Sequence, residues 1–302
     1  MNIVSDLSFI QRLCRTLRSM TLGLLLSTTP SLADMSAEEV LGTTIHELET
    51  GLDARIGVLV RDSLSGWQWG HREDERFLMN STFKSLLCGA VLSQVDRGKL
   101  TLDEPIPVRA EDILQYAPVT KEHVGATLSI GDLCLATLDL SDNTAANLLI
   151  DRLGGPSSIM TNLGIVGDSV TRIDRREPDL NTFTHGDPRD TTSPAAMLTT
   201  WDAMLLGDAL EPESQAQLAE WMSHGGTTGA FLRASAPNNW QVVDKSGGGR
   251  EYTRSVVAMV TPPGEAPYLV AIYVSDTPAD WAMRNAAVAE IGAAVIEVMK
   301  AR

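Results

Sequence analysis

The stretch from Asn80 to Val91 reads Asn-Ser-Thr-Phe-Lys-Ser-Leu-Leu-Cys-Gly-Ala-Val. Its apolar residues recur with the spacing of one helix face, which predicts a buried helix beginning near Ser81. Ser81 and Lys84 are three residues apart and therefore share a face of that helix. A serine hydroxyl becomes a good nucleophile when a neighbouring base takes its proton, and a lysine whose pKa is lowered by burial can act as that base. The stretch therefore suggests a nucleophile and a base, although Ser-x-x-Lys alone is more often an N-cap followed by a solvated lysine.

Length and charge limit the classes of function. The chain has 302 residues, 43% of them hydrophobic, which is enough for one large domain or two closely associated ones. Its formal net charge is −15, which argues against nucleic acid and against anionic membranes as partners. No stretch is apolar for long enough to form an ordinary transmembrane helix. A small anionic substrate is still compatible with this composition, since a local basic pocket can lie in an acidic protein.

Residues 1–33 have the pattern of a secretory signal peptide. Three arginines precede a short apolar segment at 20–26, and the segment 31–33 reads Ser-Leu-Ala, with small residues where a signal peptidase reads them. We expect cleavage after Ala33, export to the periplasm and no membrane attachment afterwards. An amphipathic anchor helix is the alternative, disfavoured because the apolar segment is compact and ends at 28–30.

Cysteines and histidines indicate no metal site. Cys14 lies in the signal, which leaves Cys88 and Cys134 in the exported chain. Two cysteines in an oxidising compartment readily form a disulfide, but both lie in expected helices, so two buried thiols are the alternative. The five histidines form no His-x-His or His-x-x-x-His pair, and there is no Cys-x-x-Cys, so we expect neither a metal nor another cofactor.

Strand patterns occur early and late in the chain, with helical patterns between them. Strands are expected at 55–61, 67–70, 240–245, 255–260 and 268–274, and helices at 36–50, 81–97, 129–138, 144–153, 193–205 and 279–300. The connections between the late strands are too short for a crossover helix, which favours antiparallel pairing.

These patterns predict an α/β (α+β) fold in which a five-stranded antiparallel sheet with flanking helices accompanies an inserted all-α domain. The discontinuous α/β domain would comprise 34–75 and 225–302, and the all-α domain 76–224. The polar segment 172–192 is too long and irregular for a simple connector, which indicates a functional loop or disorder. A cleft between the two domains is where we expect a site.

Three further motifs follow the Ser-x-x-Lys pair. Ser141-Asp142-Asn143 lies between two expected helices, Glu177-Pro178-Asp179-Leu180-Asn181 lies in the polar loop, and Lys245-Ser246-Gly247 ends a strand. In this order the four motifs resemble those of the class A serine β-lactamases. The likeness extends from about Ser36 to the last helix. It implies a serine β-lactamase/penicillin-binding-protein-like fold, a monomer, and a small-molecule β-lactam as substrate.

The resemblance also implies catalytic roles. Ser81 would attack the lactam carbonyl, and the backbone N–H groups of Ser81 and Gly248 would form the oxyanion hole. Ser141 would pass a proton to the departing lactam nitrogen. Glu177 would activate the water that hydrolyses the acyl-enzyme, and Asn181 would help to hold that water. Either Lys84 or Glu177 would be the base for acylation, a choice that the sequence leaves open.

Binding and structural roles follow from the same resemblance. The substrate would be bound by Tyr116, Asn143, Lys245, Ser246, Gly247 and Arg254. Structural roles would belong to the disulfide Cys88–Cys134, to the ion pair Arg175–Asp190 at the neck of the loop, and to Asn285, which would orient Arg254. Tyr116 could instead be a packing aromatic.

Two other functions remain open. A penicillin-binding DD-peptidase would share Ser-x-x-Lys and Lys-x-Gly, but Glu177 with Asn181 argues against it because that pair supplies the deacylating water. A β-lactam-sensing receptor module would normally be tethered to a membrane. The spectrum of substrates is not indicated, although Asn80 and Gly249 stand where some carbapenem-hydrolysing relatives have a cysteine pair.

Overall fold

The central element is a five-stranded antiparallel sheet built from both ends of the chain. The computed structural model describes residues 35–164 and 167–302, so the expected signal peptide lies outside the described residues. The strand order is β2-β1-β9-β8-β7. The strands are β1 (Arg55–Asp62), β2 (Gln68–His71), β7 (Gln241–Gly248), β8 (Tyr252–Thr261) and β9 (Tyr268–Thr277). Early strand β1 pairs with late strand β9 over its whole length, so the expected sheet is confirmed.

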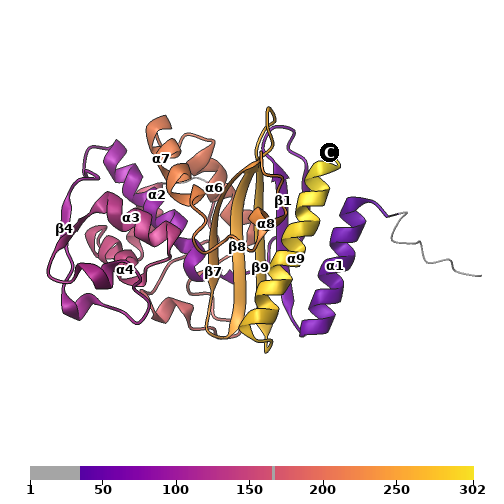
Figure 1. The fold of residues 1–302 in the computed structure, drawn as a ribbon, viewed down its shortest axis with the longest axis horizontal. Coiled ribbons are helices and arrows are strands. Elements are labelled where there is room, and N and C mark those ends of the chain that lie inside the picture. The colour runs from indigo at the N-terminus through magenta and orange to yellow at the C-terminus, as the bar shows by residue number, and fades with distance from the viewer. Residues whose placement is uncertain (1–34, 165–166) are drawn as a thin grey trace, which may run out of the picture. The chain divides into compact units, whose positions relative to one another are not determined.

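One face of the sheet is covered by helices from the two ends of the described chain. α1 (Ala37–Leu52) and α9 (Trp281–Lys300) lie beside it, together with the short α8 (Leu232–Ser235) (Figure 1). Alternate strand residues such as Val58, Val256 and Ile272 pack against these helices in one apolar cluster. α1 begins at a capping box, in which Ser36 accepts from the backbone N–H of Glu39.

The other face supports the helical part of the fold, at the left in Figure 1. Its helices are α2 (Phe83–Asp96), α3 (Ile130–Asp139), α4 (Asn143–Arg152), α5 (Ser158–Leu163), α6 (Pro194–Leu205) and α7 (Pro212–Ser223). Every residue of α2 from Phe83 to Gln94 is buried, so the expected buried helix is confirmed and lies at the centre of this part. The boundary of an all-α domain at 76–224 stays a prediction.

Short elements complete the fold and were not anticipated individually. They are β3 (Phe77–Leu78) with β6 (Thr191–Thr192), β4 (Pro105–Pro107) with β5 (Thr127–Ser129), and the 3-10 helices η3 (Asn80–Thr82), η4 (Ala110–Asp112), η5 (Thr120–His123) and η6 (Asp179–Asn181). The β3–β6 pair joins the chain just before Ser81 to the end of the polar loop. Among the helices in 35–164 and 167–302, none is both long and apolar enough to span a membrane.

Two details differ from the sequence-based expectations. The α-helix after Ser81 begins at Phe83, because Asn80–Thr82 form a tighter 3-10 turn first. Cys88 and Cys134 are buried free thiols, so the expected disulfide is absent from the described structure. Cys88 Sγ instead donates to the carbonyl oxygen of Cys134 at 3.8 Å.

Candidate active site

Ser81 lies in a strained turn at the wall of a large cavity. The cavity has a volume of about 950 Å³ and is lined by residues from the helical part, the polar loop and strands β7 and β8. Asn80, which precedes Ser81, has a φ of 46°, a backbone conformation that costs free energy for a non-glycine residue and that often occurs at functional sites. Its side-chain amide donates to Asn181 Oδ1 at 3.0 Å, which ties this turn to the polar loop.

Lys84, one turn after Ser81, is completely buried among oxygen acceptors. Its Nζ donates to the backbone oxygen of Ser141 at 2.7 Å and to Asn143 Oδ1 at 2.6 Å, and it lies 3.2 Å from Ser141 Oγ. It also lies 3.2 Å from Glu177 Oε1. Burial lowers the pKa of Lys84, while the charge and hydrogen bond of Glu177 oppose that shift only in part. The neutral amine that a general base requires is therefore more accessible than in a solvated lysine.

Glu177 extends into the site from the polar loop, and both its backbone and its carboxylate are hydrogen-bonded. Asn147 on α4 accepts from its backbone N–H at 3.0 Å and donates to its backbone oxygen at 2.8 Å. Asn181 Nδ2 donates to Glu177 Oε2 at 2.5 Å. Although Glu177 Oε1 lies near Lys84, it accepts no well-aligned hydrogen bond from the described residues. That buried oxygen therefore has an acceptor position left for a water molecule or a substrate.

A cluster of cations lies on strands β7 and β8 beside the cavity. Lys245 on β7 is fully buried, and burial together with Lys84 and Arg254 holds its pKa well below the usual value. Arg254 on β8 donates to the backbone oxygen of Gly247 at 2.7 Å and to Asn285 Oδ1 at 2.6 Å. Burial and Arg284 lower the pKa of Arg254 to about 10.

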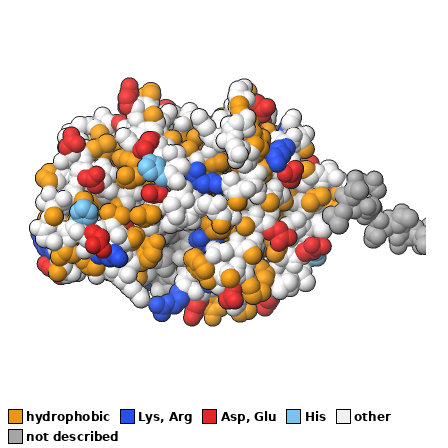
Figure 2. Space-filling view, viewed as in Figure 1, with side chains coloured by type: hydrophobic (Ala, Val, Ile, Leu, Met, Phe, Trp, Pro, Cys, Tyr) orange, Lys and Arg blue, Asp and Glu red, His pale blue; other side chains and the backbone are white. Residues whose placement is uncertain are grey.

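Lys245, Arg254 and Arg284 form no ion pair in the part of the chain that the structure describes. Within the described ranges, no carboxylate oxygen lies within 4.0 Å of a charged nitrogen of Lys245, Arg254 or Arg284. On the face in Figure 2 the surface is hollowed beside the sheet, and basic side chains lie in and next to the hollow. A buried positive charge without a counterion favours an anionic group in the cavity.

The end of strand β7 approaches the nucleophile turn so closely that only glycine fits. A Cβ at Gly247 would lie 2.6 Å from the backbone oxygen of Met79 and 2.6 Å from Ser255 Oγ. A Cβ at Gly248 would lie 2.8 Å from the ring of Trp281. The backbone of β7 can therefore lie directly against the cavity beside Ser81.

We expect Gly247→Ala to lower the free energy of unfolding by about 1–3 kcal/mol, because the backbone oxygen of Met79 cannot move aside as a flexible side chain could. Urea denaturation at pH 7 measures the change. Gly51→Ala in α1 is the control, since a Cβ there meets no atom within 4 Å. Equal stability of the two variants would show that the turn yields to the extra methyl group.

Known proteins share this sequence and arrangement. Residues 41–299 match the family model described as "Beta-lactamase enzyme family". The chain is 48% identical to a β-lactamase of Rhodobacter capsulatus over 95% of this chain and 97% of that protein. The chain belongs to the class A serine β-lactamases.

Other relatives agree with this assignment. The chain is 43% identical to β-lactamase L2 of Stenotrophomonas maltophilia, over 87% of this chain and 88% of that protein. A crystal structure of a β-lactamase from Xanthomonas campestris superposes with a TM-score of 0.84 at 44% identity, covering 87% of this chain and 99% of that one. An ancestral class A β-lactamase superposes with a TM-score of 0.82 at 47% identity, covering 85% and 99%. The chain is thus a hydrolase of the β-lactam ring.

The structure of this β-lactamase brings most of the expected site residues to one cavity. The lining includes Ser81, Tyr116, Ser141, Asn143, Asn181, Ser246, Gly247, Gly248 and Arg254. Lys84, Glu177 and Lys245 are buried behind that lining. Tyr116 is half exposed at the rim, which fits a wall of the cavity better than a core packing role.

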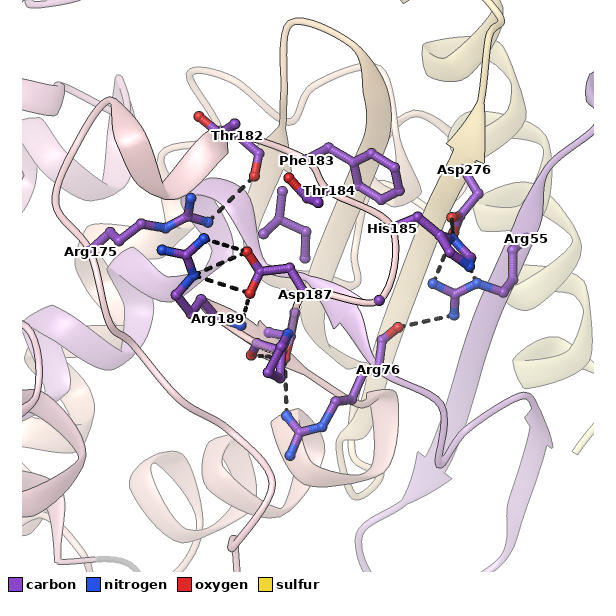
Figure 3. Close-up of a pocket in the computed structure, with 14 residues that line it drawn as sticks. Arg55, Arg76, Arg175, Thr182, Phe183, Thr184, His185, Asp187, Arg189 and Asp276 are labelled. Atoms are coloured by element: carbon purple, nitrogen blue, oxygen red, sulfur yellow. Dashed lines mark hydrogen bonds and ion pairs between the residues drawn. The ribbon is translucent and has the colours of Figure 1, made fainter.

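The neck of the polar loop is closed by hydrogen bonds around Asp190. Asp190 Oδ1 accepts from the backbone N–H groups of Asp174 and Arg175 at 2.7 and 2.9 Å, and Arg175 Nε donates to Asp190 Oδ2 at 2.5 Å. Beneath the loop lies a second cavity of about 210 Å³, shown in Figure 3. At the far end of that cavity, Asp276 on β9 bonds His185 of the loop and Arg55 of β1, each at 2.9 Å.

We expect Asp276→Asn to lower the free energy of unfolding by about 1 kcal/mol at neutral pH. Burial raises the pKa of Asp276, but His185 and Arg55 outweigh it, so the folded-state pKa lies below 3.8. Stabilisation from a lowered carboxyl pKa is complete above the unfolded value and is lost as the pH falls through the folded value. Urea titrations at pH 7 and near pH 3 should therefore show a difference that shrinks in acid. An unchanged difference at both pH values would contradict this assignment.

Several residues of the site were missed by sequence reasoning. Asn147 lies four residues after Asn143 and so on the same helix face, a spacing that could have identified it. Phe183 and Tyr252 form a tilted aromatic pair, with ring centroids 5.3 Å apart, that joins the loop to the start of β8. No local sequence pattern identifies Trp281 as a residue of the site, because its neighbours in the cavity come from distant parts of the chain.

Proposed function

We propose that the enzyme hydrolyses the amide bond of penicillins and cephalosporins through an acyl-enzyme on Ser81, and thereby confers β-lactam resistance. The observation that carries the proposal is the buried contact between Lys84 and Glu177, one turn from Ser81. This contact pairs two candidate bases, one from the helix that follows Ser81 and one from the polar loop. The cations on β7 and β8 would provide a site for the carboxylate that these substrates carry.

In acylation, Ser81 Oγ attacks the lactam carbonyl carbon as a base takes its proton. The carbonyl oxygen becomes an oxyanion that the backbone N–H groups of Ser81 and Gly248 would stabilise by several kcal/mol. The carbon–nitrogen bond then breaks, and Ser141 gives its hydroxyl proton to the lactam nitrogen. Lys84 Nζ, 3.2 Å from Ser141 Oγ, can replace that proton. Lys84 and Glu177 both stay candidates for the acylation base.

In deacylation, Glu177 takes a proton from a water molecule that attacks the ester carbonyl. Asn181 contacts the Glu177 carboxylate and lines the cavity, so it can hold that water on the side of the ester. The ester bond to Ser81 Oγ breaks, the serine recovers its proton, and the opened β-lactam acid leaves. Asn143 and Tyr116 would hold the acyl side chain, while Lys245, Ser246 and Arg254 would hold the carboxylate.

A chromogenic cephalosporin tests the proposal against the two alternatives. The enzyme should turn over many equivalents, and intact-protein mass spectrometry after the reaction should show no lasting adduct. Ser81→Ala should abolish turnover. A DD-peptidase or a sensing module would instead stop after one equivalent and keep the adduct.

We also propose that the enzyme is exported to the periplasm as a monomer that begins at Asp34. The sequence of 1–33 supports this step. N-terminal sequencing of protein from a periplasmic extract, with the mass measured by light scattering, tests it. An N-terminus at Met1 or a dimeric mass would contradict it.

A further inference from the structure

Trp281, the first residue of α9, lies at the wall of the active-site cavity with 46% of its surface exposed. The Arg254 guanidinium carbon lies 4.5 Å from the centre of its ring, and that of Arg284 lies 5.5 Å away. The ring of Phe231 lies 4.7 Å from the same Arg254 carbon. Two aromatic rings therefore contact Arg254, one of the two cations expected to bind the substrate carboxylate.

The two rings stabilise an Arg254 guanidinium that has no carboxylate partner in the described part of the chain. Its guanidinium is largely buried, Arg284 repels it, and no carboxylate of the described chain pairs with it. Cation–π contacts stabilise such a desolvated cation. Its Nε and Nη1 are occupied by Asn285 and by the backbone oxygen of Gly247, whereas Nη2 donates to no residue in the described part of the chain. The nitrogen left for a ligand is thus Nη2.

We propose that Trp281 is a positioning residue for the substrate carboxylate, because its indole holds the Arg254 guanidinium flat and presents Nη2 to the cavity. The inference rests on the proposed function and names a residue of that same site. Arg284 holds the backbone just before Arg254, since it donates to the backbone oxygens of Thr253 and Arg250 at 2.8 and 3.0 Å. Gly248 leaves the room that the indole needs.

The test compares a chromogenic cephalosporin with its methyl ester, which lacks the carboxylate charge. Trp281→Ala should lower kcat/KM for the free acid about tenfold through KM, and should leave kcat and the rate on the ester within about twofold. Trp281→Phe, which keeps an aromatic face, should recover most of the loss. Trp281→Leu, which keeps apolar volume without a ring, should resemble Trp281→Ala. Thermal unfolding confirms that each variant is folded.

Trp67→Ala is the matched control, since Trp67 contacts Arg302 in the same way, at 3.9 Å, outside the cavity lining. It should leave all rates unchanged. An equal loss on acid and ester, or an unchanged KM for the acid in Trp281→Ala, would overturn the inference while the wild type still hydrolyses the cephalosporin. A wild type that hydrolyses neither compound would instead overturn the proposed function, and this inference with it.

Discussion

Replacing Glu177 by glutamine is expected to trap the enzyme as an acyl-enzyme on Ser81. The amide cannot take a proton from water, and general-base catalysis of this kind typically contributes about 10²–10⁴-fold. Glutamine keeps the shape that fits between Lys84 and Asn181, so the site should stay assembled. Deacylation should therefore slow by roughly a thousandfold while a covalent adduct still forms. Intact-protein mass spectrometry within a minute of adding a penicillin measures the adduct.

The rate at which the adduct forms shows whether Lys84 or Glu177 is the acylation base. If Lys84 is the base, the adduct forms at nearly the wild-type rate; if Glu177 is, acylation slows as well and the adduct accumulates over a longer time. Glu122→Gln is the control, because Glu122 is exposed and, among the described residues, its ion pair is with Lys121, at 3.7 Å. Normal turnover by Glu177→Gln without any adduct would contradict the role given to the loop.

The sheet could be predicted because its information is local. Short continuous apolar runs identify β1 and β9. The short connections between the late strands leave only antiparallel pairing. The cavity residues in the four motifs could be identified because each motif lies within a few residues of sequence. The resemblance that they carry then assigned roles to Ser81, Lys84 and Glu177.

Other features depend on packing between distant segments. Arg254 lies between Phe231 and Trp281, which come from the segment before α8 and from the start of α9, and no spacing in the chain relates them. Asn80, whose φ is strained, donates a hydrogen bond to Asn181, about a hundred residues away. The resemblance implied a Cys88–Cys134 disulfide, but no sequence pattern says how the two sulfurs are oriented.

Asp244→Ala is expected to lower the free energy of unfolding by about 3–5 kcal/mol. Its side chain, on β7, is fully buried and accepts from Arg233 Nη2 at 2.7 Å and from Thr228 Oγ1 at 2.7 Å. Burial raises the pKa of Asp244, and Arg233 opposes that shift. Removing the carboxylate leaves the largely buried Arg233 without a counterion next to the strand that carries Lys245. Urea denaturation measures the loss.

Glu104→Ala provides the matched control, since Glu104 pairs with Arg152 at the surface, where about a third of each side chain is exposed. That pair should contribute less than about 1 kcal/mol. The double variant Arg233→Leu/Asp244→Ala distinguishes two explanations of a large loss of stability in Asp244→Ala. If the cost comes from leaving one charge buried alone, the double variant is more stable than Asp244→Ala, because both charges are gone. If the pair itself contributes the stability, the double variant recovers nothing. A loss below about 1 kcal/mol for Asp244→Ala would show that water reaches Arg233 once the carboxylate is removed.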